Sequence, residues 1–271
     1  MKKLAIASAL LSALAITGTA HAYQAEVGAT AGLIDPDHGS SRGLFGVDGT
    51  YYFNPVQTRN APLAEAAFLD RASNVNAHYD YSQIGDLKNN VYGIGGEFYV
   101  PNSDFYLSAN VERDELKFKR NLQSNVDLKK FNTTFYGAEV GYLPAPGLLV
   151  AVGVKGYDND YKNSADPTLR AKYVTDLNNG QAINLEAGVG FGDLDEWNVA
   201  ADYYFDKTLS VGVDYYDKDH NKDFNIANDR QFGINARKFV TPQVSLEGRV
   251  GFGKAEHTDY NTYGVAAKYR F

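Results

Sequence analysis

The last ten residues, TYGVAAKYRF, alternate between two kinds of side chain. Tyr263, Val265, Ala267, Tyr269 and Phe271 are apolar or aromatic, and the residues between them are small or basic. Alternation with a period of two is typical of a β-strand that has one apolar and one polar face. The sequence therefore predicts a strand that runs to the last residue.

The same alternation recurs along the chain in fourteen segments, which are separated by stretches rich in turn residues. We expect Val, Leu, Ile, Tyr and Phe to occupy one face of each segment, and lipid to cover that face. Twelve or sixteen strands are the alternatives, because such boundaries shift by about two to four residues. The predicted strands are Tyr23–Leu33, Arg42–Phe53, Ser73–Gln83, Asn90–Val100, Phe105–Lys119, Phe131–Leu143, Leu148–Asn159, Thr168–Leu177, Gln181–Phe191, Glu196–Phe205, Thr208–Asp217, Arg230–Phe239, Val244–Lys254 and Tyr260–Phe271.

The connections between these segments fall into two classes. Those after even-numbered segments include the tight turns PNSD, PAPG, NNG, DK and VTP, whereas those after odd-numbered segments include KRNLQSNVDLKK, YKNSADP and KDHNKDFNIAN. Short turns on one side and long loops on the other are typical of outer-membrane barrels, in which the short turns face the periplasm. This asymmetry predicts an even number of strands, with both termini on the periplasmic side.

The N-terminus, MKKLAIASALLSALAITGTAHA, predicts export. Two lysines precede an apolar run from Leu4 to Ile16, and an Ala-x-Ala site ends at Ala22. This pattern is typical of a secretory signal peptide, and the apolar run is too short for a spanning helix. We therefore expect residues 1–22 to be a signal peptide and residues 23–271 to be the barrel, with a retained helical anchor as the alternative.

Composition narrows the class of protein further. There is no cysteine, which excludes a disulfide-stapled domain, a thiolate metal site and a cysteine nucleophile. The formal charge of −7 argues against nucleic acid as a partner, and nothing predicts a cofactor. With 20 Tyr and 15 Phe in a chain that is polar on average, we expect a transmembrane β-barrel with a polar lumen and an apolar outer face.

In a closed barrel the last strand pairs with the first, and YQAEVGATAGL alternates in the same way. Tyr269 and Phe271 would then lie in the aromatic girdle at the periplasmic interface. A terminal Phe after alternating apolar residues resembles the signature that the barrel assembly machinery reads in Gram-negative outer-membrane proteins. The alternative is the edge strand of a soluble β-sandwich.

Three stretches resemble a family of outer-membrane porins from Gram-negative bacteria. They are YQAEVGA at the mature start, GTYYFNPV at Gly49–Val56 and APLAEAAFLDRASNV at Ala61–Val75. The similarity is most specific over the first hundred or so residues. It implies a monomeric barrel in the outer membrane, in contact with lipid and lipopolysaccharide, that allows passive diffusion of small solutes, ions and water and carries pore-constricting elements.

One long inner connection, Asn54–Ala72, interrupts the barrel pattern. It contains helix formers at helical spacing, with Pro62 near the start of the predicted helix. One interpretation is a short helix that packs under the rim of the barrel. The other is a periplasmic constriction folded across the pore mouth, formed by Pro62, Leu63, Glu65 and Phe68.

The polar face of each strand predicts the charges that line the lumen. The bases fall on strands seven, eight, twelve, thirteen and fourteen, while strands one to six contribute acids alone. Such opposed arcs would set a transverse field in a wet channel, although pairing between neighbouring strands is the alternative. With ten acids against seven bases, we expect a weak cation preference. The predicted lumen residues are Glu26, Asp48, Asp80, Glu97, Glu112, Glu139, Lys155, Arg170, Lys172, Glu186, Asp202, Asp214, Arg237, Glu247, Arg249, Lys268 and Arg270.

Signals of other chemistry are few. His78 and Asp80 share a strand face, but neither a G-x-S-x-G motif nor a matched partner accompanies them. The stretch Asp217–Asp223 is similar to the start of a calcium loop, yet Lys222 occupies the position that requires glycine. Three functional classes stay open: a diffusion porin, which we favour, a plugged structural or adhesin-type barrel that acts through its extracellular loops, and an enzyme barrel.

Overall fold

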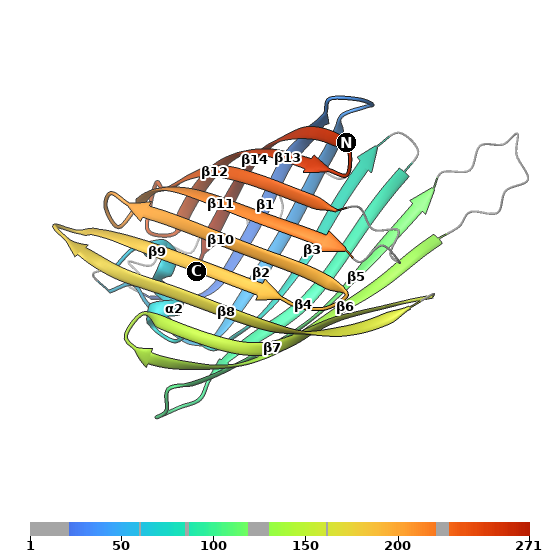
Figure 1. Cartoon of the computed structure of the whole chain (residues 1–271). Helices are drawn as coiled ribbons and strands as arrows, with labels where there is room; N and C mark the ends of the chain where they lie inside the picture. Colours follow the sequence, from blue (N-terminus) through green and yellow to red (C-terminus); the bar gives the residue numbers. More distant parts are fainter. Residues whose placement is uncertain (1–21, 60, 85–86, 119–129, 161, 221–227) are drawn as a thin grey trace, which may run out of the picture.

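The computed structural model describes residues 22–59, 61–84, 87–118, 130–160, 162–220 and 228–271. In this part of the chain fourteen antiparallel strands form a closed barrel, which confirms the predicted fold class and strand number (Figure 1). The predicted signal peptide lies outside the described residues, apart from Ala22. The strands are β1 (Ala22–Pro36), β2 (Arg42–Gln57), β3 (Asn74–Ile84), β4 (Leu87–Tyr99), β5 (Phe105–Phe118), β6 (Lys130–Ala145), β7 (Leu148–Asn159), β8 (Asn163–Asn178), β9 (Gln181–Gly190), β10 (Leu194–Tyr204), β11 (Leu209–His220), β12 (Asp229–Phe239), β13 (Val244–Ala255) and β14 (Thr258–Arg270).

The barrel closes where the last strand pairs with the first, as the alternation predicted. β14 pairs with β1 along its length, with Glu26 opposite Arg270. The terminal residue extends this ladder: the backbone N–H of Phe271 donates to the carbonyl of Ala25 at 3.0 Å, and its carbonyl accepts from Gln24 and Ala25. Closure leaves neither strand with an unpaired edge, which a membrane would not tolerate.

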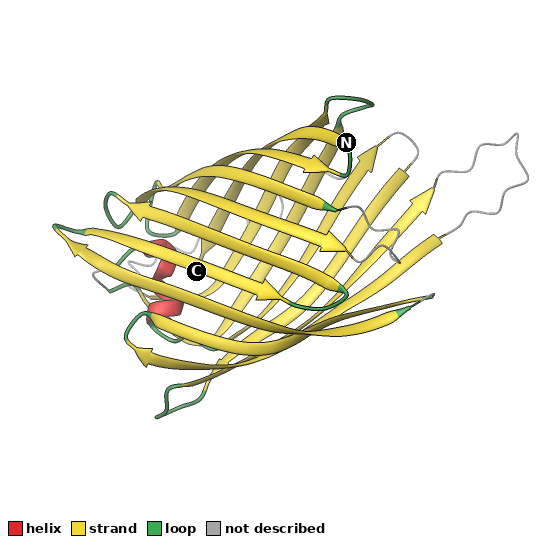
Figure 2. Cartoon of the chain, in the orientation of Figure 1, coloured by secondary structure: helices red, strands yellow, loops and turns green. Residues whose placement is uncertain are grey.

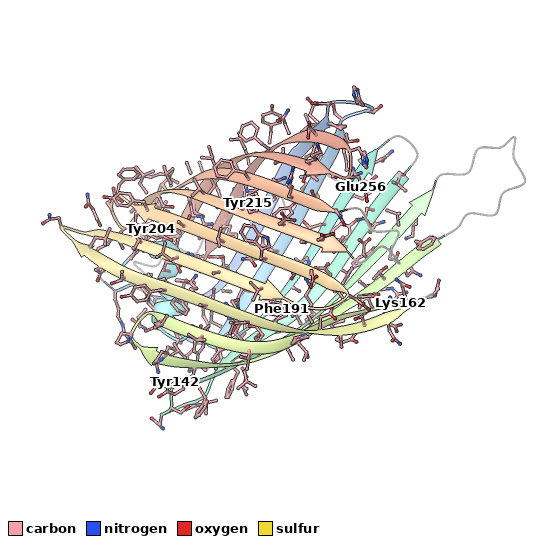
Figure 3. The ribbon with its side chains drawn as sticks, in the orientation of Figure 1. Tyr142, Lys162, Phe191, Tyr204, Tyr215 and Glu256 are labelled. Atoms are coloured by element: carbon pink, nitrogen blue, oxygen red, sulfur yellow. The ribbon has the colours of Figure 1, made fainter. Side chains whose placement is uncertain are left out.

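The outward face of the wall is apolar. Ile94, Val152 and Val265 are 59%, 60% and 64% exposed, and Figure 3 shows side chains projecting from the ribbon all around the barrel. A wall that is one strand thick sends alternate side chains outward and inward, so exposed aliphatic residues on every strand fit a lipid environment. No helix in the described residues is long and apolar enough to cross a membrane.

We call the end of the barrel that carries the connections 100–104, 146–147, 179–180, 205–208 and 240–243 the turn end. The C-terminus and the short helix α2 lie at this end in Figure 1, and Figure 3 places Tyr142 and Tyr204 there, with Lys162 and Glu256 at the opposite end. Exposed aromatic rings gather outside the turn end, including Phe105 and Tyr142 with ring centroids 5.5 Å apart. Tyr269 and Phe271 stack at 6.1 Å. These rings occupy the position expected of an aromatic girdle.

Several strands extend further than the alternation predicted. β2 continues to Gln57, so the inner connection starts later than Asn54. β8 begins at Asn163, so most of YKNSADP is strand instead of loop, and β11 reaches His220. Backbone hydrogen bonds hold these extensions, and such bonds do not require an apolar face. The sequence 119–129 and residues 221–223 of the calcium-like stretch lie outside the described residues.

The assumption that aromatic side chains face lipid was wrong at the turn end. Tyr106, Tyr204 and Phe239 are 1%, 2% and 4% exposed and lie on the inward face of their strands. Tyr23 is also buried, next to a register shift between Tyr23 and Ala25 that changes which side of the wall it faces. Inside the barrel, the insert between β2 and β3 packs Phe68 against Tyr106 and Ala66 against Tyr23, and it offers the Glu65 carboxylate to the Tyr204 hydroxyl. The Phe239 ring lies 4.6 Å from the Arg270 guanidinium.

Candidate functional site

The insert between β2 and β3, residues 58–73, contains a 3₁₀ turn (η1, Leu63–Glu65) followed by the single helical turn α2 (Ala66–Leu69). Figure 2 shows this helix within the ring of strands at the turn end. The base of the insert is closed by Asp70, whose carboxylate accepts hydrogen bonds from the Gln57 N–H at 2.9 Å and the Arg59 guanidinium at 2.7 Å. Pro62, with φ −53°, precedes the 3₁₀ turn, as its fixed φ favours.

Polar contacts join the insert to distant strands. The Leu63 N–H donates to the Lys207 carbonyl at 2.9 Å, and Arg270 donates to the Leu63 carbonyl at 2.8 Å. The Glu65 carboxylate accepts from Lys172 at 2.8 Å and from the Tyr204 hydroxyl at 2.6 Å. Since β2 and β3 lie opposite β8, β9 and β10 in the closed ring, the insert reaches across the turn-end mouth.

Apolar contacts hold the insert on its other sides. Phe68 packs against a buried cluster of Tyr99, Tyr106, Leu143 and Leu149 from β4 to β7, and the Lys172 ammonium lies 5.0 Å from the centre of its ring. A second buried cluster packs the insert against β1 and β2, and it is formed by Ala66, Tyr23, Tyr52, Val56 and Ala72. The four residues predicted to constrict the mouth therefore contact or adjoin several parts of the wall.

All seventeen predicted lumen residues lie on the inward face, opposite the exposed apolar side chains. The predicted bases do not form a free arc, because each contacts a carboxylate. Pairing between strands, the alternative interpretation, describes this side of the lumen. The pairs are Lys155–Glu196, Arg170–Glu139, Lys172–Glu186, Arg237–Glu247, Arg249–Asp214, Lys268 with Glu26 and Asp48, and Arg270–Glu26.

The remaining acids have weaker partners. Glu97 accepts hydrogen bonds from Asn74 and Tyr106, and Asp202 accepts one from Asn184. Glu112 lies 3.2 Å from Nε2 of His78, and Asp80 lies 4.0 Å from it. Among the described residues, none of these four acids contacts a lysine or arginine, and three of them lie on β3, β4 and β5.

Glycines allow long side chains to meet across an intervening strand. His78 on β3 reaches Glu112 on β5 over Gly93, where a Cβ would lie 2.0 Å from the imidazole. Arg249 on β13 reaches Asp214 on β11 over Gly233, where a Cβ would lie 2.4 Å from the guanidinium. The polar side chains thus lie along the wall instead of across the lumen.

The candidate catalytic pair was His78 with Asp80, and the structure shows which groups surround His78. Its partners are the two carboxylates, and no described hydroxyl group is bonded to it. Throughout the described part of the chain, no group of three or more His, Asp or Glu side chains is placed to hold a metal ion.

A polar cavity of about 360 Å³ opens in the lumen wall from β3 to β10. It brings together the predicted residues Glu97, Glu139, Lys155 and Arg170, and adds several that the sequence analysis missed. The sequence did contain a signal for some of the missed residues. Glu196 and Asn198 lie an even number of positions from Asp202 on the same strand, and Asn110 lies two positions from Glu112, so they share the inward face of those residues. The missed residues are Tyr106, Ser108, Asn110, Thr168, Glu196 and Asn198.

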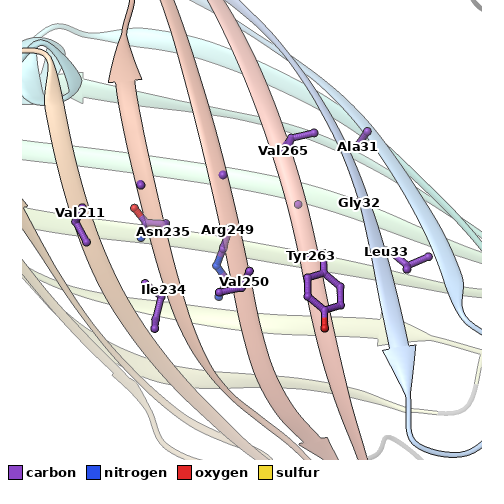
Figure 4. A pocket seen from close by; sticks show the side chains of 13 residues that line it. Ala31, Gly32, Leu33, Val211, Ile234, Asn235, Arg249, Val250, Tyr263 and Val265 are labelled. Carbon is purple, nitrogen blue, oxygen red and sulfur yellow. The ribbon is translucent and has the colours of Figure 1, made fainter.

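A groove larger than this cavity lies on the outer surface. It has a volume of about 630 Å³ and crosses β11 to β14 and β1, with Val211, Ile234, Val250 and Tyr263 around it (Figure 4). Because its lining is largely apolar and belongs to the lipid-facing side of the wall, hydrocarbon is its natural solvent. The lumen, with its charged wall and covered mouth, is therefore the candidate site for solutes.

Comparisons with known proteins agree with this geometry. The sequence profile of the family described as "Putative general bacterial porin" matches residues 1–271. The outer membrane protein Omp33 of Acinetobacter baumannii is 30% identical, with a TM-score of 0.67 over 92% of this chain and 99% of that chain.

More distant structures share the fold alone. A monoaromatic hydrocarbon channel, CymD, is 6% identical with a TM-score of 0.61 over 92% of this chain and 89% of that chain. A FadL homologue of Pseudomonas aeruginosa is 9% identical with a TM-score of 0.53 over 92% of this chain and 90% of that chain. No curated protein sequence matches the chain. The chain belongs to the general bacterial porin family and is a non-enzymatic channel barrel of the bacterial outer membrane.

Proposed function

We propose that the protein is a monomeric porin for passive diffusion of small hydrophilic solutes, ions and water, and that the insert limits this flow at the periplasmic mouth. The observation that carries the proposal is the attachment of the insert to the far side of the barrel, where Leu63 bonds to Lys207 in the β10–β11 turn and Glu65 to Lys172 and Tyr204 on β8 and β10. A charged, half-exposed lumen continues beyond this point. Diffusing solutes would therefore meet their narrowest passage beside the insert.

The charge of the lumen favours cations weakly. The predicted lumen set contains ten acids and seven bases, and the bases are paired. Asp80, Glu97 and Glu112 lack a lysine or arginine partner within the described residues, so they add a negative potential to one side of the wall. In a salt gradient across a planar bilayer, we expect a reversal potential that corresponds to a weak cation preference.

Export and assembly complete the proposal. The signal peptide, residues 1–22, would direct the chain to the periplasm, and Tyr269 and Phe271 would present the C-terminal strand to the barrel assembly machinery. Deletion of Phe271 should lower assembly into the outer membrane while periplasmic export continues. Equal assembly of the two chains would remove Phe271 from this role.

Single-channel recording in a planar bilayer tests the function directly. We expect discrete conductance steps from protein whose mobility in SDS gels changes on boiling, since closed barrels resist detergent. A folded barrel that conducts no ions would contradict the porin proposal.

The second candidate is a plugged structural or adhesin-type barrel. It is favoured by the burial of Glu65, which accepts two hydrogen bonds in a closely packed mouth. In that case conductance would be absent in the native chain, and the extracellular loops would carry the function.

A further inference from the structure

Two ion pairs of the lumen wall lie together in the polar cavity. Glu139, Thr168 and Glu196 belong to one row of paired residues that crosses β6, β8 and β10, and Gly153 and Gly190 lie between them. Arg170 follows Thr168 by two positions toward the turn end. Lys155 lies on β7, two positions beyond Gly153 toward the opposite end. Both signs of charge therefore line one recess.

The ion pairs in this recess leave hydrogen-bonding capacity unused. Arg170 donates to Glu139 from Nε at 3.1 Å and from Nη2 at 2.8 Å, and Nη2 also contacts the Tyr106 hydroxyl. Among the described residues, Nη1 of Arg170 donates no hydrogen bond. The Lys155 ammonium lies 2.6 Å from both oxygens of Glu196, and the four charged side chains are 21–36% exposed. They can therefore reach a solute without leaving the wall.

Uncharged polar groups surround these pairs. The exposed amides of Asn110 and Asn198 lie over Gly137 and Gly188, where a Cβ would come within 2.6 Å of each amide oxygen. Neither amide, nor the Thr168 hydroxyl, has a hydrogen-bond partner within the described part of the chain. In a vacant pore, water would satisfy them, and a solute with several polar groups could replace that water.

We propose that this recess is a subsite for small zwitterions of the α-amino acid type. The solute carboxylate would bind Arg170 Nη1 and Lys155, while its ammonium would bind Glu139 or Glu196 together with an amide oxygen. A simple cation or anion could use one half of the recess, whereas a zwitterion uses both without adding net charge. Permeation through the site rests on the proposed function, but binding to it does not.

Calorimetric titration of the refolded barrel in detergent tests binding without requiring conductance. The probes are L-alanine, ethylamine, propionate and the neutral propionamide. We expect L-alanine to bind about tenfold more tightly than each of the others, as one further charge-assisted hydrogen bond would provide. Equal affinity for all four probes would overturn the proposal.

A matched pair of variants locates the site. Arg170→Gln should weaken L-alanine binding about tenfold, the loss of one charge-assisted contact. Arg237→Gln, which removes a similar ion pair from another part of the wall, should leave that affinity unchanged. Equal losses in the two variants would overturn the assignment.

Bilayer recording separates the failure of this inference from the failure of the proposed function. L-alanine should reduce the ion current of the native chain but not that of Arg170→Gln. A normal ion current without L-alanine binding would overturn the subsite but not the porin proposal. L-alanine binding without any ion current would overturn the porin proposal but not the subsite.

Discussion

The turn-end mouth and the middle of the lumen use the same chemistry in different surroundings. At the mouth, the Glu65 and Lys172 side chains are 7% and 17% exposed and lie against Phe68 and Tyr204. In the middle, Arg249 and Asp214 are paired but remain 33% and 25% exposed. The first pair is shielded from water, and the second is in contact with it.

This difference decides what each ion pair does. A buried pair that loses one partner leaves an uncompensated charge, so it holds the insert in place. A wet pair contributes little to stability because solvent screens it, yet its charges still act on ions that pass nearby. Burial thus separates a structural contact at the mouth from an electrostatic lining in the pore.

The largest effect on stability is expected from a charge placed on the lipid-facing side of the barrel wall, which supports both the mouth and the lumen. Val213 is outward-facing, and Val213→Lys should cost up to about 2–4 kcal/mol, the range for lysine near the bilayer midplane. The measurement is urea unfolding in lipid vesicles, with the folded fraction read from the heat-dependent shift in SDS gels. Asn198→Lys, a matched change on the inward face, should fold normally; equal destabilisation would show that the two faces are wrongly assigned. Val250→Lys should behave as Val213→Lys does.

Breaking the buried pair should act next most strongly. Glu65→Gln keeps a partner for Tyr204 but removes the charge that Lys172 contacts, while Lys172 retains Glu186. Removal of one partner costs about 3–5 kcal/mol where the other charge is left uncompensated. Because Glu186 still compensates Lys172, we expect the loss here to stay below that of Val213→Lys. We expect the insert to detach for part of the time, which single-channel recording would detect as flicker to higher conductance. Glu247→Gln, in a wetter pair, is the control and should not flicker.

The wet pairs should respond through selectivity. Replacement of Arg237 and Arg249 by Ala leaves Glu247 and Asp214 without their basic partners. One charge about 8 Å from an ion in water is worth about 0.5 kcal/mol, so cation preference should rise about twofold per charge. Reversal potentials in a salt gradient measure this rise. Lys238→Ala, a change on the outward side, is the control and should leave the reversal potential unchanged. A strong anion preference in the native chain would contradict the assignment of the lumen residues.

Much of the fold could be predicted because the membrane demands a regular pattern. Lipid on one side and water on the other force period-two alternation, and Val213, Val250 and Val265 obey it. The rule fails for Tyr106 and Tyr204, since inside the barrel the insert gives Tyr106 the apolar partner Phe68 and gives the Tyr204 hydroxyl the acceptor Glu65. Turn-end rings therefore could not be assigned to a face from their polarity alone.

The partners of the lumen charges were harder to predict than the charges. Parity along a strand identifies Arg249 and Asp214 as inward, but their contact passes over Gly233 on the strand between them. Similarly, nothing local to Glu65 indicates Lys172, which is far away in sequence and meets it only after the barrel closes. Such contacts depend on the register of several strands together.

The smallest effect is expected at the turn between β10 and β11, which supports the insert through the Lys207 carbonyl. Asp206 accepts hydrogen bonds from the Thr208 hydroxyl and the backbone N–H groups of Thr208 and Leu209, and those from Thr208 are the main cause of its lowered pKa. A lowered pKa means that this contribution to stability is present above the unfolded pKa and is lost as pH falls through the folded pKa. Asp206→Asn should remove that acid dependence from thermal unfolding curves; an unchanged dependence would assign it to other carboxyl groups.

The most direct test of the central claim is the single-channel conductance of a chain in which residues 58–73 are replaced by a tight turn. If the insert limits flow at the turn end, conductance should rise while the heat-dependent shift in SDS gels stays the same. If conductance is unchanged in this folded variant, the insert is a rim support, and the narrowest part of the pore lies elsewhere.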